Sequence, residues 1–198
     1  MNKEELIESL RKQGFSPLIV NAFSQVQREK FVPENLESYA YEDIPLPIET
    51  GATISQPSTV AFMLDLLEIK TDSKVLEIGS GSGYALALIS FLTNNDIYGV
   101  EINQRLAVKS KNVLENEKRI HIINKSGVEG LPENSPYDRI LISAAFYSLH
   151  KIRYLLSQLK DNGILVAPVG NVIYQIKKID GKIIEKEFPG FVFVPMQD

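Results

Sequence analysis

The sequence predicts an α/β fold in which helices cover both faces of a doubly wound, mostly parallel β-sheet. Three observations predict it. Short apolar runs alternate with amphipathic stretches from residue 58 to residue 167. One apolar run leads through a glycine-rich loop directly into a helical stretch. The end of the chain carries a hairpin pattern instead, so we expect antiparallel strands at the C-terminal edge of the sheet.

The first 57 residues differ from the rest of the chain. Residues 1–30 predict two short helices, because apolar residues recur there at helical spacing and Ser16-Pro17 is a typical helix start. Residues 31–57 contain four prolines, which argue against a continuous helix or a central strand. This segment is also too apolar for a solvated linker. We therefore expect an ordered, irregular segment that includes a short strand pair.

Helices and strands then alternate in the order that builds a parallel sheet. Helices are expected at 58–69, 84–92, 103–115 and 149–159, and strands at 74–78, 97–100, 120–123, 139–143 and 164–167. A helix between two strands returns the chain so that the strands pair in parallel. Beyond them, residues 172–187 predict a hairpin around the type I′ turn Asp180-Gly181. Residues 191–194 predict a last strand.

The composition excludes several kinds of chemistry. Of 198 residues none is cysteine and two are histidine, which excludes disulfides, cysteine-ligated metals, thiol nucleophiles and histidine-rich metal cages. We expect no metal site. The formal net charge of −4 gives no electrostatic footprint for nucleic acid. No signal peptide and no apolar run near the ~20 residues of a membrane span is visible, so we expect a cytoplasmic protein without membrane contact.

The most informative motif is the glycine-rich loop within residues 75–84 (VLEIGSGSGY). Glycine lets the backbone approach a ligand closely, beside the free N–H groups of a helix start. Glu101 stands twenty-two residues after Gly79, at the end of the next predicted strand. A carboxylate at that place can accept hydrogen bonds from ribose hydroxyls. The loop and the acid together predict a cofactor that contains a nucleoside.

The residues of the loop favour a cofactor with an amino-acid end over a dinucleotide. The dinucleotide pattern G-x-G-x-x-G/A is broken, because Tyr84 stands at its last position. Glu77, at the strand end, would repel a pyrophosphate but attract the ammonium group of an amino acid. S-adenosyl-L-methionine has such a group and no phosphate. Two alternatives stay open here: a loop that only turns the chain, and a nicotinamide-dependent oxidoreductase.

Further segments match one known family in their residues and in their order along the chain. They are 28–33 (REKFVP), 40–47 (AYEDIPLP), 51–57 (GATISQP), 136–140 (PYDRI), 143–145 (SAA), 158–160 (QLK), 168–170 (PVG) and 193–196 (FVPM). With the glycine loop, they resemble the protein-L-isoaspartate O-methyltransferase family over roughly residues 28–196. The 51–57 segment is similar to the family's G-x-T-I-S-x-P. The glycine loop alone would indicate only a methyltransferase. The 51–57 segment and the final FVPM narrow the resemblance to this family.

The resemblance implies an activity and a cofactor. The enzyme would be a protein-L-isoaspartate (D-aspartate) O-methyltransferase with a Rossmann-like fold. It would transfer a methyl group from S-adenosyl-L-methionine to the α-carboxyl of L-isoaspartyl residues in damaged proteins or peptides, leaving S-adenosyl-L-homocysteine. The ester would close to a succinimide, whose hydrolysis returns some normal aspartate. The resemblance also implies a strand order near 3-2-1-4-5-7-6, counted from the strand before the glycine loop.

The resemblance places the family's catalytic serine on Ser55. A carboxylate is already ionised at pH 7 and can attack a sulfonium methyl group without a general base. Catalysis then rests on positioning and on the exclusion of water. We expect the Ser55 hydroxyl to hold the substrate carboxylate by a hydrogen bond, without becoming a covalent nucleophile. A serine that only caps the turn before Pro57 is the alternative.

The expected site residues fall into two groups. Thr53, Ile54 and Ser55 are expected to bind the substrate. The expected cofactor-binding residues are Glu77, Gly79, Ser80, Gly81, Gly83, Glu101, Ile102, Ser126 and Gly127. Ile102 is expected on the adenine face, with an ordinary core position as the alternative. We interpret the chain as one S-adenosylmethionine-dependent methyltransferase domain, 1–198, with a substrate-side segment at 1–57 and a cofactor-binding sheet at 58–198.

Three departures from the family pattern leave the substrate open. Residues 125–127 (KSG) stand where the family usually has Gly-Asp-Gly, Ser58 where many relatives have histidine, and 146–150 where relatives often carry prolines. A methyltransferase of this fold with a different carboxylate substrate, or a non-catalytic S-adenosylmethionine-binding module, are therefore alternatives. The expected partners are isoaspartyl-containing peptide or protein segments, and the expected state is a monomer.

Overall fold

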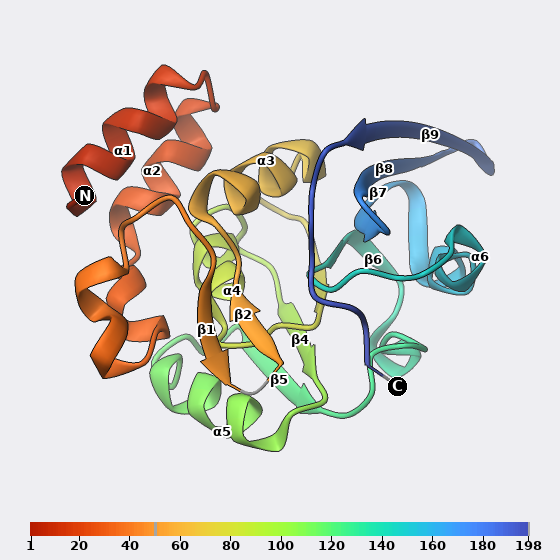
Figure 1. Cartoon of the computed structure of the whole chain (residues 1–198). Helices are drawn as coiled ribbons and strands as arrows, with labels where there is room; N and C mark the ends of the chain where they lie inside the picture. Colours follow the sequence, from red (N-terminus) through yellow and green to blue (C-terminus); the bar gives the residue numbers. More distant parts are fainter. Residues whose placement is uncertain (50, 198) are drawn as a thin grey trace.

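The computed structural model describes residues 1–49 and 51–197. A seven-stranded sheet in the order β5-β4-β3-β6-β7-β8-β9 forms its centre (Figure 1). Its strands are β3 (Val75–Ile78), β4 (Ile97–Glu101), β5 (Ile120–Asn124), β6 (Tyr137–Ile142), β7 (Leu159–Val169), β8 (Val172–Ile179) and β9 (Lys182–Pro189). Strands β3 to β7 pair in parallel, and β8 and β9 are antiparallel. The predicted mostly parallel, Rossmann-like sheet with antiparallel C-terminal strands is confirmed.

The order of the last two strands is a correction. Counted from β3, the sheet runs 3-2-1-4-5-6-7, so the expected exchange of the final pair is wrong. Strand β8 turns back beside β7 directly after Gly170 and Asn171, and β9 turns back beside β8. Such short turns place consecutive strands side by side. Asp180 and Gly181 both have positive φ (49° and 73°), as the predicted type I′ turn requires.

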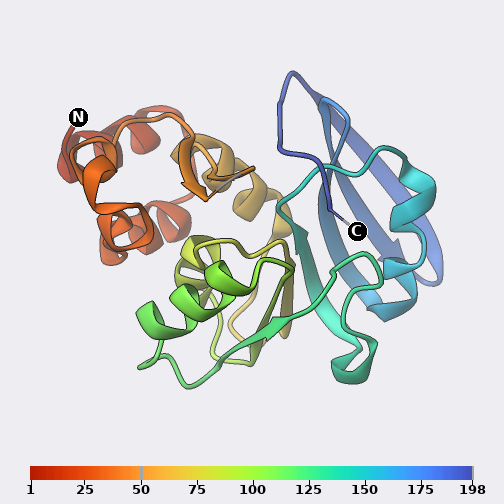
Figure 2. The ribbon, with the colours of Figure 1, turned by 60° about the horizontal axis from the view of Figure 1, so that its bottom comes forward.

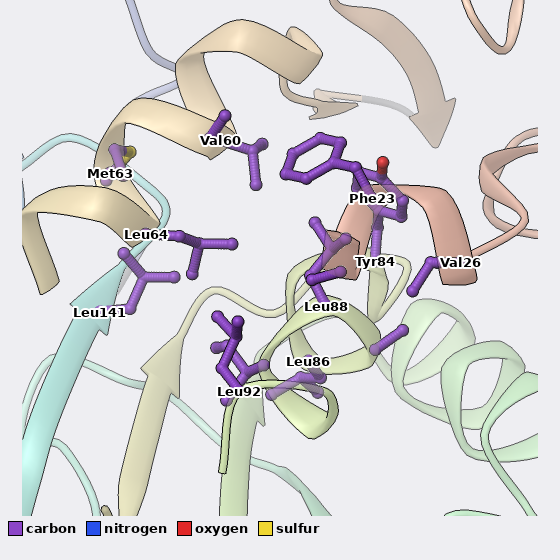
Figure 3. Close-up of a cluster of buried hydrophobic side chains, with 14 of the residues drawn as sticks. Phe23, Val26, Val60, Met63, Leu64, Tyr84, Leu86, Leu88, Leu92 and Leu141 are labelled. Atoms are coloured by element: carbon purple, nitrogen blue, oxygen red, sulfur yellow. The ribbon is translucent and has the colours of Figure 1, made fainter. Parts of the chain in front are cut away.

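The two faces of the sheet carry separate hydrophobic clusters, because successive strand residues point to opposite sides. On one face, α3 (Pro57–Leu67), α4 (Tyr84–Ser90) and α5 (Gln104–Val113) cover the strands. Figure 3 shows Leu141 of β6 beside Leu64 of α3 in this cluster. The other face is covered by α6 (Leu149–Ile152) and the 3-10 helix η4 (Leu155–Gln158).

The N-terminal segment packs against the helical face. Helices α1 (Lys3–Lys12) and α2 (Pro17–Gln25) are the two predicted ones, and α2 lies on α3 and α4. The 3-10 helices η1 (Arg28–Phe31) and η2 (Glu34–Tyr39) follow, and then the predicted strand pair, β1 (Leu46–Glu49) and β2 (Ala52–Ile54). Figure 2 shows these N-terminal elements and the C-terminal strands at opposite ends of the molecule. No helix among the described residues is long and apolar enough to cross a membrane.

Two predicted elements differ from the structure. The helix expected at 149–159 is only α6 and η4, because the buried residues Ile152, Leu155 and Gln158 repeat every three positions, the period of a 3-10 helix. Residues 191–194 form no strand. The segment 190–197, the C-terminal strap, joins the loop after β6, where Ala145 N–H donates to Val194 O at 2.8 Å and Met196 N–H donates to Ala145 O at 2.8 Å. Pro195, between these two bonds, has no N–H to extend a ladder.

Candidate active site

The carboxyl ends of β3, β4 and β6 meet at one edge of the sheet. The chain winds outward from β3 to β4 and β5 and then returns to the other side of β3 with β6. Ligands of open α/β sheets bind at such a switch point, outside the carboxyl ends of the strands. Here the glycine loop follows β3, and the β1–β2 hairpin and the C-terminal strap line the same region (Figure 1).

The glycine loop is fixed by backbone contacts with β4. Gly79 N–H and Ser80 N–H both donate to Val100 O, at 2.8 and 3.1 Å. Gly83 starts α4 with φ of 86°, and a Cβ on it would lie 2.8 Å from Leu114 Cδ1. Both the positive φ and the close packing require glycine there. The loop therefore presents its backbone toward the crevice in a fixed conformation.

Glu101 ends β4 beside this loop. Its side chain is 7% exposed and accepts hydrogen bonds from two backbone groups, Gly81 N–H at 2.7 Å and Asn103 N–H at 2.8 Å. A carboxylate oxygen has two lone pairs, so each oxygen of Glu101 can accept a further donor. The pair of bonds aims this carboxylate at the space beside Gly81, where ribose hydroxyls could reach it.

Glu77 is buried more deeply and less completely paired. It is 1% exposed, and its Oε1 accepts the Ser143 hydroxyl at 2.7 Å, while Oε2 has no partner among the described residues. Burial raises the pKa of Glu77 from its ordinary value of 4.5 to about 8; the Ser143 hydrogen bond opposes this rise and the nearby Glu101 adds to it. The Ser80 hydroxyl is also buried without a partner. An unpaired buried carboxyl with a raised pKa fits a ligand that brings a positive charge.

Three adjoining pockets lie in this crevice. The strap pocket has a volume of about 400 Å³ and lies between Ser55, Thr59 and strap residues 192–195. The loop pocket lies between Ser55, Glu77 and the glycine loop. The β4 pocket lies between Gly81, Glu101, Ile102 and the strap. Thr53 and Ser143 line all three pockets.

The structure brings most of the predicted site residues together. Ser55 lies where the strap and loop pockets meet, between β2 and α3. The predicted residues that line the loop or the β4 pocket are Thr53, Ile54, Ser55, Glu77, Gly79, Ser80, Gly81, Glu101 and Ile102. Ile102 is 38% exposed, so the alternative of an ordinary core position is wrong.

Three predicted cofactor residues lie outside these pockets. Gly83 packs on Leu114 behind the loop, and Ser126 and Gly127 follow β5. A Cβ on Gly127 would lie 2.4 Å from Ile78 Cγ2, so this glycine packs on the end of β3. Within the described part of the chain, no group of three or more His, Cys, Asp and Glu side chains is arranged to hold a metal ion.

The three departures from the family pattern also lie away from the pocket walls. Ser58 accepts a hydrogen bond from Gln56 Nε2 at 2.9 Å, and it lines none of the three pockets. In the 146–150 segment Phe146 is buried against Val169, and Tyr147 is 84% exposed. Neither Ser58 nor Ser126 nor residues 146–150 line any of the three pockets.

Sequence reasoning missed Ser143 and the role of the strap. Ser143 follows β6, which pairs directly with β3, the strand that contains Glu77, so the sheet order brings the two side chains together. The reversal of the strand order at β3 was the available signal. Residues at the carboxyl ends of β3 and of its two neighbouring strands share the crevice at such a reversal. The strap gave no signal of its own, since its place depends on contacts with Ala145.

The fold and this site define the class. A Rossmann-like sheet with a glycine loop at its switch point, an acid at the end of the next strand and a buried acid beside the loop is typical of S-adenosylmethionine-dependent methyltransferases. The comparisons with known proteins identify the family. The model of the protein-L-isoaspartate(D-aspartate) O-methyltransferase family matches residues 1–198. The chain belongs to this family.

Individual relatives agree along almost the whole chain. A protein-L-isoaspartate O-methyltransferase from Fervidobacterium nodosum is 44% identical, covering 97% of this chain and 100% of the relative. One from Thermosipho melanesiensis is 41% identical, covering 96% and 100%. The solved structure of a Plasmodium falciparum protein-L-isoaspartate O-methyltransferase in complex with S-adenosyl-L-homocysteine has a TM-score of 0.85 at 26% identity, covering 100% of this chain and 99% of that one.

Proposed function

We propose that Ser55 and the strap pocket hold the α-carboxylate of an L-isoaspartyl residue while a methyl group is transferred to it from S-adenosyl-L-methionine. The activity is that of the family, protein-L-isoaspartate O-methyltransferase, which begins the repair of isoaspartyl residues. One observation carries the proposal. Ser55 belongs to the walls of both the strap pocket and the loop pocket, where substrate and cofactor have to meet.

The cofactor contacts follow from the charges in the crevice. Glu77 would pair with the ammonium group through its unpartnered Oε2, and Glu101 would accept the ribose hydroxyls. Ile102 would lie against the adenine, and Gly79, Ser80 and Gly81 would pass close to the amino-acid end. Gly83, Ser126 and Gly127 would act as supports behind these contacts. The bound cofactor supplies an electrophilic methyl group on a sulfonium.

The protein's part in the reaction is positioning. The substrate carboxylate is ionised at neutral pH and needs no general base. The Ser55 hydroxyl would donate to one carboxylate oxygen and leave the other free to attack in line. Thr53 and Ile54 would shape the pocket around it, and the strap would exclude water. None of these steps uses a thiol or an imidazole, which fits a chain with no cysteine and two histidines.

The geometry of the site also bears on the kind of substrate and on the oligomeric state. A pocket of about 400 Å³ suits one residue of a flexible peptide segment better than a folded domain. We propose a monomer, because one chain supplies Ser55, Glu77 and Glu101 to the site. A cytoplasmic location is proposed from the lack of cysteine, since the chain makes no use of an oxidising compartment.

The direct test is methyl transfer from labelled S-adenosylmethionine to an isoaspartyl peptide. We expect a base-labile methyl ester, with the matched aspartyl peptide as the control. Equal labelling of both peptides would overturn the assignment of the substrate. Cofactor binding without transfer to the isoaspartyl peptide would favour another carboxylate substrate or a non-catalytic binding module.

A further inference from the structure

Arg28 is a buried cation near the proposed active site. It belongs to η1 and is 0% exposed. Its Nε donates to Ala40 O at 2.7 Å, and its Nη2 donates to Ser55 O at 3.0 Å and lies 3.5 Å from Ile44 O. Within residues 1–49 and 51–197, its Nη1 has no hydrogen-bond partner. Removing a cation from water is unfavourable unless its contacts compensate, so this arrangement calls for a reason beyond packing.

The guanidinium joins three parts of the site that are distant in the sequence. Its Cζ lies 4.8 Å from the ring centroid of Tyr84, the first residue of the helix that follows the glycine loop. The Tyr84 ring packs against Phe23 (Figure 3) and Phe31. Through Ala40 O, Arg28 also holds the irregular segment, and through Ser55 O the residue proposed to bind the substrate. One side chain thus connects the cofactor loop with the substrate side.

The residues that follow Ser55 are held by Asp43, which belongs to the same irregular segment. Asp43 Oδ1 accepts Ser58 N–H at 2.8 Å, at the start of α3, and Oδ2 accepts Gln56 Nε2 at 3.3 Å. Ser55 lies in neither a strand nor a helix, so these side-chain contacts replace a ladder of backbone bonds. A fixed carbonyl fixes the peptide plane that follows Ser55 and so restrains the direction of its Cα–Cβ bond. The hydroxyl is then confined to the few staggered rotamers about that bond.

We propose that Arg28 is a positioning residue: by holding the Ser55 carbonyl, it aims the Ser55 hydroxyl at the substrate carboxylate. This inference rests on the proposed role of Ser55. A planar guanidinium can hold Ala40 O and Ser55 O at once with a fixed spacing, whereas a lysine ammonium on a flexible stem cannot reproduce that fork. A misplacement of about 1 Å at a reacting group can lower a rate about 100-fold.

The chain offers a matched control. Arg139 is also buried, at 5% exposure, and its Nε and Nη2 donate to a single carbonyl, Glu68 O, at 3.0 and 2.9 Å. It lies on β6 away from the three pockets. Arg28→Lys and Arg139→Lys therefore each replace a buried guanidinium whose Nε and Nη2 donate to backbone carbonyls, one beside the site and one away from it. Arg28→Met is a further variant that removes every donor of the side chain. If Arg28→Met does not fold, Arg28→Lys can still be compared with Arg139→Lys.

The experiment measures kcat and KM with an isoaspartyl peptide, the Kd of S-adenosyl-L-homocysteine, and thermal stability. We expect both lysine variants to lose stability. Arg28→Lys should lose about 10- to 100-fold in kcat, and Arg139→Lys should keep kcat within about twofold. The Kd should stay unchanged in Arg139→Lys, and in Arg28→Lys it should change far less than kcat, because Glu77 and Glu101 are untouched and only the contact with Tyr84 is altered. Equal kcat values for the two lysine variants would overturn the proposal.

A double variant separates this inference from the proposed function. If Arg28 acts through Ser55, Arg28→Lys combined with Ser55→Ala should lose no more kcat than Ser55→Ala alone. Losses that multiply would show that Arg28 acts elsewhere, and they would overturn the inference. An unchanged kcat in Ser55→Ala would instead remove the role of Ser55 itself, which is a failure of the proposed function.

Discussion

The cofactor side and the substrate side of the site are held by different interactions. On the cofactor side, Glu77 and Glu101 belong to paired strands of the central sheet, and the glycine loop is bonded to the backbone of β4. On the substrate side, Ser55 follows a separate two-stranded sheet and is held by Arg28. The opposite wall of its pocket is the strap, which is bonded to Ala145.

This difference teaches how each side responds to change. A residue within a sheet keeps its place when a neighbouring side chain is replaced, because the backbone ladder holds it. Substitutions on the cofactor side therefore report the chemistry of one contact. Ser55 depends on a few bonds from side chains to backbone, and a single substitution can remove any of them. Substitutions on the substrate side therefore report position as well as chemistry.

The largest expected effect tests the cofactor side. Glu77→Gln keeps the shape of the side chain and removes the charge that is proposed to face the ammonium group. Removing one partner of a buried charge pair costs about 2–5 kcal/mol. We expect the affinity for S-adenosyl-L-homocysteine, measured by calorimetry, to fall by that amount, with the exposed Glu187→Gln on β9 as the control. An affinity within threefold of the wild type, roughly 0.7 kcal/mol, would remove Glu77 from the proposed contacts.

The same residue gives a pH dependence without any ligand. Burial raises the pKa of Glu77 to about 8 in the folded protein, against 4.5 ordinarily, so between these values the folded state binds a proton that the unfolded state has lost. This contribution to stability is fully present below pH 4.5 and is lost as the pH rises to about 8, with a slope of at most about 1.4 kcal/mol per pH unit. Glu77→Gln lacks it.

We therefore expect the stability of Glu77→Gln relative to the wild type, measured by urea denaturation, to rise by about 2–4 kcal/mol between pH 4.5 and pH 8. Glu77 would then destabilise the folded protein at pH 8 while serving to bind the cofactor. Parallel stability curves for the two proteins across this pH range would contradict the raised pKa of Glu77.

The two sides also differ in how well the sequence predicts them. The glycine loop, Glu101 and the Asp180-Gly181 turn are local signals, and the structure has each where it was expected. The bonds from Arg28 to Ser55 and from Ser143 to Glu77 span 27 and 66 positions, so no local pattern announces them. The strap failed as a predicted strand for a similar reason, because its conformation depends on Ala145 rather than on its own β-propensity.

A smaller effect tests the substrate side. Ser55→Ala removes the hydroxyl proposed to hold the carboxylate, and a hydrogen bond to a charged group is worth about 1.5–3 kcal/mol. We expect kcat with an isoaspartyl peptide to fall about 10- to 100-fold, and the affinity for S-adenosyl-L-homocysteine to stay unchanged. Ser58→Ala is the matched control, because its hydroxyl meets Gln56 and lines none of the three pockets. Equal losses in the two variants would mean that Ser55 only supports the turn before α3.

The smallest effect compares two glycines with the same φ, one behind the glycine loop and one away from the site. Gly83 and Gly14 both have φ of 86°, so Gly→Ala brings the same backbone strain, about 1–2 kcal/mol, to each. A Cβ on Gly14, between α1 and α2, meets nothing within 4 Å, whereas one on Gly83 lies 2.8 Å from Leu114 Cδ1. We expect Gly83→Ala to lose about 1 kcal/mol more in the free energy of unfolding, because the flexible Leu114 side chain can give way only in part. It should also weaken cofactor binding, since Gly83 starts the helix behind the loop, while Gly14→Ala should not. If the two variants lost equal stability and kept equal affinity, the packing behind the glycine loop would not contribute to holding the cofactor side.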